Sequence, residues 1–131
     1  MDRVRAPTRL AVPCTLDQAA AVRRRLRNDL RDVGLSRDLQ ADAEIVLGEL
    51  LGNALLHGTA RPDGTVGVDW LIGAESVRVC VTDGGSPPRL RAFDAPNFAS
   101  SGRGLRIVAE LASEWGVELH DPGVTVWAQI G

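Results

Sequence analysis

Three polar residues with a spacing of four stand in an otherwise apolar segment: Glu49, Asn53 and His57. On an α-helix a step of four residues rotates only about 40° around the axis, so these side chains would form one stripe. The other residues between Val46 and Leu55 are mostly apolar, which indicates a largely buried helix. A carboxylate, an amide oxygen and an imidazole one turn apart suit a cation–phosphate ligand with a base beside it. A solvated face with i, i+4 hydrogen bonds explains the same stripe, and the stripe alone favours this simpler interpretation.

A second group with chemical potential is Asp83, which is followed by Gly84 and Gly85 and preceded by an apolar strand candidate. Glycines allow a flat ligand to approach the backbone closely. An ionised carboxylate only accepts hydrogen bonds, so Asp83 could select an exocyclic amino group such as that of adenine. An ordinary turn at the end of a strand is the alternative interpretation.

The third group is the sequence Gly102-Arg103-Gly104, which opens an apolar segment of helical periodicity. The free N–H groups and the dipole of such a helix start form an anion site, and Arg103 and Arg106 would reinforce it. The pattern is not a dinucleotide fingerprint, because Ile107 occupies the place of the third glycine. A glycine-rich loop end with ordinary capping explains this segment equally well.

The elements that must position these groups follow from periodicity and from cap and turn residues. We expect strands at 10–12, 65–72, 76–81, 115–119 and 124–130, and helices at 16–33, 39–56 and 104–114. Thr15 and Ser36 are the expected N-caps of the first two helices, and Gly34 and Gly58 are their expected ends. Strands grouped in hairpins with helices between them predict an α/β (α+β) fold: a two-layer sandwich of a mixed β-sheet with about three helices on one face.

The composition fits one globular domain over residues 1–131, with 1–7 as a flexible arm. Of its residues, 44% are hydrophobic and 24% are charged, and the net charge is -2. This balance argues against direct nucleic-acid binding, and the absence of long apolar runs argues against a membrane segment. All 15 basic residues are arginine, which excludes a Walker-A loop and lysine chemistry. Cys14 and Cys80 form no CxxC pair, so we expect a cytoplasmic protein.

The three groups gain meaning from their order: Glu-x3-Asn on a helix, Asp-x-Gly after a strand, and Gly-x-Gly-Leu opening a helix. This order resembles the N, G1 and G2 boxes of the GHKL ATPases, which have the Bergerat (histidine-kinase-type ATPase) fold. The short chain resembles in particular the stand-alone anti-sigma-factor serine kinases of actinobacteria. The resemblance extends from Leu10 to Ile130.

The resemblance implies a role for each residue of the first two boxes. Glu49 matches the general base that takes a proton from an attacking serine, and Asn53 matches the asparagine that coordinates Mg²⁺ between the ATP phosphates. His57 matches the end of the same box, which implies proximity to the nucleotide and no catalytic role. Asp83 matches the aspartate that reads adenine, and Gly85 matches the glycine behind the ring.

The resemblance also covers the phosphate side and the last strand. Gly102, Gly104 and Leu105 match the G2 box beneath the phosphates, and residues 86–101 would be the ATP lid. Thr125 matches a late-strand threonine that supports Asp83 and adenine, often through water. Two departures stand out: Pro87-Pro88 replaces a glycine of the G1 pattern and stiffens the start of the lid, and Arg103 or Arg106 must replace a lysine that some relatives have near the phosphates.

The implied function is an ATP- and Mg²⁺-dependent serine/threonine protein kinase that phosphorylates an anti-anti-sigma (STAS-type) partner and thereby regulates a sigma factor. A non-catalytic, nucleotide-gated anti-sigma module and a simple ATPase remain alternatives. Relatives often dimerise, so a homodimer is an expectation as well. Arginines 23, 24, 25, 27 and 31 read best as a solvated helix face, although a role in protein docking is plausible.

Overall fold

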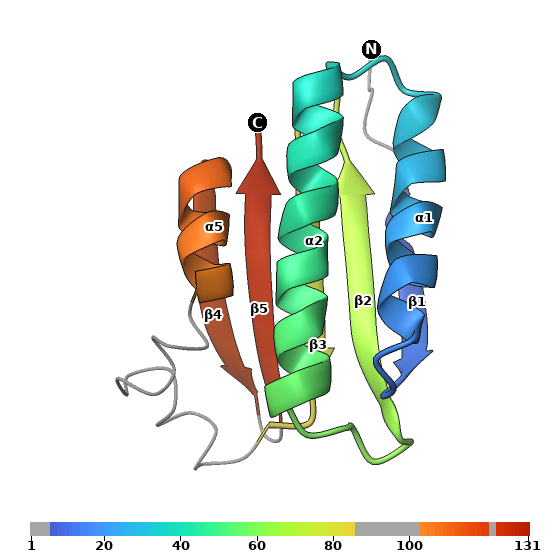
Figure 1. Ribbon diagram of the computed structural model, residues 1–131, viewed down its shortest axis with the longest axis vertical. Coiled ribbons are helices and arrows are strands. Elements are labelled where there is room, and N and C mark those ends of the chain that lie inside the picture. The colour runs from blue at the N-terminus through green and yellow to red at the C-terminus, as the bar shows by residue number, and fades with distance from the viewer. Residues whose placement is uncertain (1–5, 86–102, 121–122) are drawn as a thin grey trace.

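The computed structural model describes residues 6–85, 103–120 and 123–131. The described elements are, in chain order, β1 (Thr8–Pro13), α1 (Gln18–Arg31), α2 (Arg37–His57), β2 (Thr65–Ile72), β3 (Val77–Asp83), α5 (Arg103–Leu111), β4 (Glu114–His120) and β5 (Gly123–Ile130). The strands form one sheet in the order β1-β2-β3-β5-β4, and the three helices cover one face of it (Figure 1). This arrangement confirms the predicted two-layer α+β fold. Residues 1–5 of the expected arm at 1–7, and the expected lid at 86–101, lie outside the described residues.

The sheet differs from the expected mixed sheet, because the four strand pairings in the described residues are all antiparallel. The helices α1 and α2 follow β1 and precede β2 in the sequence, and they run antiparallel to each other (Figure 1). Strand β2 therefore runs opposite to β1. Strands β3 and β4 run in the same direction, but β5 is inserted between them. Among the described strands no neighbouring pair is parallel, so the expected mixed sheet is corrected to an antiparallel one.

The helix α2 has its ends where the sequence predicts them. The Ser36 hydroxyl accepts a hydrogen bond from the Leu39 amide at 3.1 Å, which satisfies one of the free N–H groups of the first turn. At the other end, the Gly58 amide donates to the carbonyl oxygen of Ala54 at 2.9 Å. Because α2 is the central helix of the layer, these two caps fix the part of the chain that carries Glu49 and Asn53 (Figure 1).

The start of α1 contradicts the predicted N-cap. Asp17 occupies the cap position, in a helical conformation and without a side-chain cap bond. Thr15 contributes only its backbone carbonyl, which accepts from the Gln18 amide at 3.1 Å. The turn through Leu16 and Asp17 separates Thr15 from the first helical residue, so its hydroxyl is not the cap. The end of α1 is also earlier than predicted: the helix ends at Arg31 with Asp32 as its C-cap, and Gly34, with a φ of 75°, lies in the turn that follows.

The core lies between the sheet and the helices and explains the alternation along the strands. Its members include Leu26 and Leu30 of α1, Val46, Leu47 and Leu51 of α2, Val108 of α5, and Val68, Trp70, Val79 and Ala128 of the sheet. The helix α2 packs against both β3 and α5. The segments that carry the three chemical groups of the sequence therefore all adjoin one helix. Among the described residues, no helix is long and apolar enough to cross a membrane.

Candidate functional site

The carboxylate of Asp83 lies at the end of β3, in the layer between the sheet and α2. Its side chain is only 3% exposed, and its Oδ1 atom accepts a hydrogen bond from the Gly85 amide at 2.8 Å. Its Oδ2 atom lies against Gly58, at the end of α2, where a methyl group would also approach Asp83 Cγ to 3.1 Å. The end of α2 and the end of β3 are therefore in direct contact, and a glycine makes this contact sterically allowed.

Two further glycines shape the turn after Asp83. Gly84 donates its amide to the Thr59 carbonyl, and a Cβ at this position would approach the carbonyl carbon of Ala60 to 2.9 Å. Gly85 has a φ of 52°, and a Cβ there would lie 2.8 Å from Cγ2 of Val124. Backbone therefore surrounds Asp83 where side chains would otherwise stand. We call Asp83 together with Gly58, Gly84 and Gly85 the glycine turn.

The predicted polar stripe lies on α2 and leads to the glycine turn. Glu49 and Asn53 are half-buried, whereas His57, the last residue of the helix, is exposed. The Nδ2 atom of Asn53 is buried and has no hydrogen-bond partner among the described residues. A buried N–H group without a partner is costly, and an acceptor such as water or a phosphate oxygen would satisfy it.

These features fit an adenine nucleotide with Mg²⁺. The glycine turn places backbone without side chains beside an acceptor-only carboxylate, which is the kind of group that can accept from an amino group of a flat ring. Of the Asn53 amide, the oxygen is the atom that could ligate Mg²⁺ beside phosphates, and the unpartnered Nδ2 could donate to a phosphate oxygen. In the parts of the chain that the structure describes, no cluster of three His, Cys, Asp or Glu side chains could hold a metal by itself.

The phosphate-side residues are described only in part. Gly102 lies outside the described residues, and α5 begins at Arg103, so Arg103 and Gly104 form its first turn. Leu105 is half-buried and packs against the core, and Arg106 is exposed. The helix start that the sequence predicts to face the phosphates therefore exists, and α5 adjoins α2.

Thr125 does not lie on the same side of the sheet as Asp83. It pairs with Thr82, whereas Asp83 pairs with Val124, and neighbouring residues of a strand point to opposite faces. The Thr125 hydroxyl lies 2.7 Å from the Thr82 hydroxyl and 2.8 Å from Nε2 of His120. Any support that Thr125 gives to Asp83 must therefore pass through the β3 backbone. The contact of His120 with Thr125 was not among the expectations drawn from the sequence.

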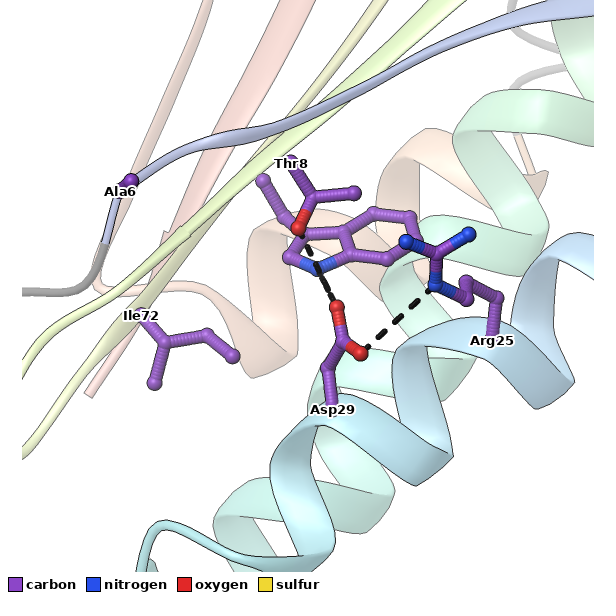
Figure 2. A pocket seen from close by; sticks show the side chains of 6 residues that line it. Ala6, Thr8, Arg25, Asp29 and Ile72 are labelled. Carbon is purple, nitrogen blue, oxygen red and sulfur yellow. Dashed lines mark hydrogen bonds and ion pairs between the residues drawn. The ribbon is translucent and has the colours of Figure 1, made fainter.

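A second polar group surrounds Asp29, in the last turn of α1. Its Oδ2 atom accepts from the indole Nε1 of Trp70 at 2.9 Å and from the Thr8 hydroxyl at 3.2 Å. The Arg25 guanidinium lies 3.7 Å from Oδ1. These residues line a cavity of about 300 Å³ together with Ala6 and Ile72 (Figure 2). The carboxylate thus joins α1 to β1 and β2.

The arginines of α1 pair partly with their surroundings. Arg27 donates to Glu44 of α2 at 2.6 Å, and this hydrogen bond with the charge of Glu44 raises the pKa of the guanidinium. Arg23 extends over Gly48, where a Cβ would approach its Cδ to 3.0 Å. These arginines lie on a solvated face of α1, as the sequence indicated, and two of them also contact α2.

The fold and the site place the chain in a known class of proteins. Residues 12–130 match the model of the histidine kinase-like ATPase domain, and the chain belongs to this family. The GHKL resemblance of the sequence is therefore confirmed, and membership implies ATP binding. No curated protein matches the chain.

Two solved structures show the same fold. One contains the RsbU and RsbW domains of Rv1364c from Mycobacterium tuberculosis, with 24% identity and a TM-score of 0.72; it covers 96% of this chain, which spans 32% of that longer chain. The other is the SiaB–SiaC complex from Pseudomonas aeruginosa, with 15% identity and a TM-score of 0.71, covering 98% of this chain and 90% of the matched one. At these identities the likeness concerns the fold alone.

Proposed function

We propose that this chain is an ATP- and Mg²⁺-dependent serine/threonine protein kinase of the anti-sigma-factor type, which phosphorylates an anti-anti-sigma partner and so regulates a sigma factor. The observation that carries the proposal is the contact of the end of α2 with Asp83 at Gly58, in a histidine kinase-like ATPase domain. This contact joins the helix of Glu49 and Asn53 to the glycine turn. The RsbW domain in one structural neighbour and the SiaB–SiaC complex in the other are in keeping with a regulatory kinase and a protein partner.

In this proposal three parts of the chain hold the nucleotide. Asp83 accepts a hydrogen bond from the adenine amino group, and the ring lies against the backbone of the glycine turn. Asn53 holds Mg²⁺ together with the phosphates, and the ion offsets phosphate charge when bound. The first turn of α5, which starts at Arg103, receives the phosphates at its positive end.

Glu49 is the proposed general base. It lies one helical turn before Asn53 and is half-buried, so its carboxylate is on the same face of α2 as the proposed Mg²⁺ ligand. Its role is to accept the proton of the partner's serine hydroxyl as the γ-phosphoryl group is transferred. The chain has little covalent work in such a transfer, because positioning and charge stabilisation lower most of the barrier.

The test of the kinase proposal replaces the base and keeps the nucleotide site. We expect Glu49→Gln to bind ATP with nearly unchanged affinity and to transfer phosphate to a candidate anti-anti-sigma protein about 10²- to 10⁴-fold more slowly. Asp42→Asn, a half-buried change earlier on the same helix, is the matched control and should transfer at the normal rate. Radiolabelled ATP and the purified partner give the rate.

The same assay separates the other functions. Transfer by Glu49→Gln at the rate of the unaltered chain would show that Glu49 is not the base. Phosphate release without a partner would identify a simple ATPase. Nucleotide binding without transfer or release, together with ATP-dependent retention of a sigma factor, would identify a non-catalytic anti-sigma module. Light scattering of the same samples tests the proposed homodimer.

A further inference from the structure

A chain of three hydrogen-bonded side chains crosses the open face of the sheet directly behind Asp83. His120, the last residue of β4, places Nε2 2.8 Å from the Thr125 hydroxyl of β5. The Thr125 hydroxyl lies 2.7 Å from the hydroxyl of Thr82, which precedes Asp83 on β3. The chain therefore links the last residue of β4 to the end of β3 across the intervening strand.

The same corner of the sheet forms the floor of the glycine turn. His120 pairs with Gly123, and Asp83 pairs with Val124. A Cβ on Gly85 would lie 2.8 Å from Val124 Cγ2 and 3.0 Å from Gly123 Cα, so Gly85 rests on the first two residues of β5. A bond that fixes the start of β5 consequently fixes the surface against which the glycine turn packs.

We propose that His120 is a positioning residue for the adenine side of the nucleotide site, acting through Thr125 and Thr82 on Asp83. The inference rests on the proposed role of Asp83 in reading adenine. His120 lies on the face of the sheet opposite to the Asp83 side chain, so it does not touch the base. It holds β5 and β3 in register at the point where Asp83 and Gly85 leave the sheet.

The hydrogen-bonding chemistry of His120, Thr125 and Thr82 explains why a histidine suits position 120. Each threonine hydroxyl can donate one hydrogen bond and accept others, and a neutral imidazole nitrogen can either donate or accept. The three groups can therefore be satisfied in either direction along the chain. A glutamine at position 120 retains a donor and an acceptor at similar reach, whereas an alanine retains neither.

The test measures the preference for ATP over inosine triphosphate, which has an oxygen in place of the amino group that Asp83 would accept from. We expect His120→Ala to lower this preference about two- to tenfold, the range for one hydrogen bond, chiefly by weakening ATP binding. His120→Gln should restore it. Thr125→Val should lower the ATP preference similarly. His120→Ala added to Thr125→Val should have little further effect, because both changes interrupt the same series of hydrogen bonds. Glu114→Ala, at the exposed start of β4, is the control and should retain the preference.

The outcomes separate this inference from the proposed function. If the unaltered chain prefers ATP and His120→Ala retains that preference, or loses affinity for both nucleotides equally, His120 is not a positioning residue. If His120→Gln fails to restore the preference, or the two changes add fully, the route through Thr125 is wrong. If the unaltered chain binds neither nucleotide, the ATP proposal fails and this inference with it. Should His120→Ala not fold, the Thr125→Val and His120→Gln measurements still decide.

Discussion

Two carboxylates lie where the helices meet the sheet, Asp29 on α1 and Asp83 at the end of β3, and the chain surrounds them in different ways. Asp29 accepts from the side chains of Thr8 and Trp70 and lies beside the Arg25 guanidinium. Asp83 accepts from a backbone amide and is enclosed by glycines. Side-chain donors surround the first carboxylate beside a cavity of about 300 Å³, whereas backbone packs closely around the second. The first carboxylate joins α1 to β1 and β2, and the second is the proposed acceptor for adenine.

The largest effect expected from this comparison is on nucleotide binding at Asp83. We expect Asp83→Asn to raise the dissociation constant for ATP about 10- to 100-fold, since it replaces an acceptor by an amide and removes a charge-assisted hydrogen bond. Isothermal titration calorimetry gives the constant. Asp29→Asn is the counterpart change and should leave it unchanged. Equal losses in both variants would remove the distinction between the two carboxylates.

At Asp29 the expected effect is on stability. We expect Asp29→Ala to lower the free energy of unfolding by about 1–3 kcal/mol, because it leaves the indole N–H of Trp70, a residue only 1% exposed, without this acceptor. Urea unfolding followed by tryptophan fluorescence measures the loss. The control is Asp32→Ala, an exposed residue just after the same helix. A stability equal to that of the control would contradict the structural role of Asp29.

Two glycines of α2 sharpen the comparison further, since only one of them touches a carboxylate. We expect Gly58→Ala to weaken ATP binding and to cost about 1–3 kcal/mol of stability, because its methyl group would collide with Asp83 and with the Ala54 carbonyl. Gly52 has no atom within 4 Å of an added Cβ, so Gly52→Ala should stabilise the helix by about 0.5–1 kcal/mol. Thermal unfolding of both variants checks the signs. A stabilised Gly58→Ala would show that the glycine turn is not tight.

The smallest effect concerns Cys80, on the open face away from both carboxylates. Burial raises the pKa of its thiol, so in the folded chain the thiol should lose its proton at higher pH than in the unfolded chain. Above the pKa of the unfolded thiol, this difference makes stability fall as the pH rises. In a Cys14→Ser background, the alkylation rate against pH should have its midpoint above that of the chain in urea. A midpoint at or below it would contradict the assignment.

The sequence predicted α2 closely because its signals are local. Ser36 and Gly58 are chemically suited to the two ends, and the apolar residues between them repeat with helical spacing. The N-cap of α1 was wrong because Thr15 is a good capping residue in type but stands two residues too early. Local signals decide which element forms, and the geometry of the connecting turn decides which residue ends it.

The non-local part of the site was less accessible. The order of the three boxes predicted that α2, Asp83 and α5 belong together, but no local pattern shows that β5 lies between β3 and β4. This insertion makes the neighbouring pairs antiparallel and brings Thr125 beside Thr82. The contact of His120 with Thr125 could have been predicted from the hairpin register. His120 pairs with Gly123, so Thr125, two residues further along β5, is its diagonal neighbour on the same face.

The position of Gly58 at the end of α2 also limits how the chain can change its length. Each residue added to or removed from a helix shifts everything beyond it by about 1.5 Å and rotates it by about 100°. A single insertion between the Ser36 cap and Gly58 would bring a residue with a side chain against Asp83, where an added Cβ collides with the carboxylate. Insertions and deletions should therefore be tolerated in the connection at 59–64 far better than within α2, which acts as a fixed spacer.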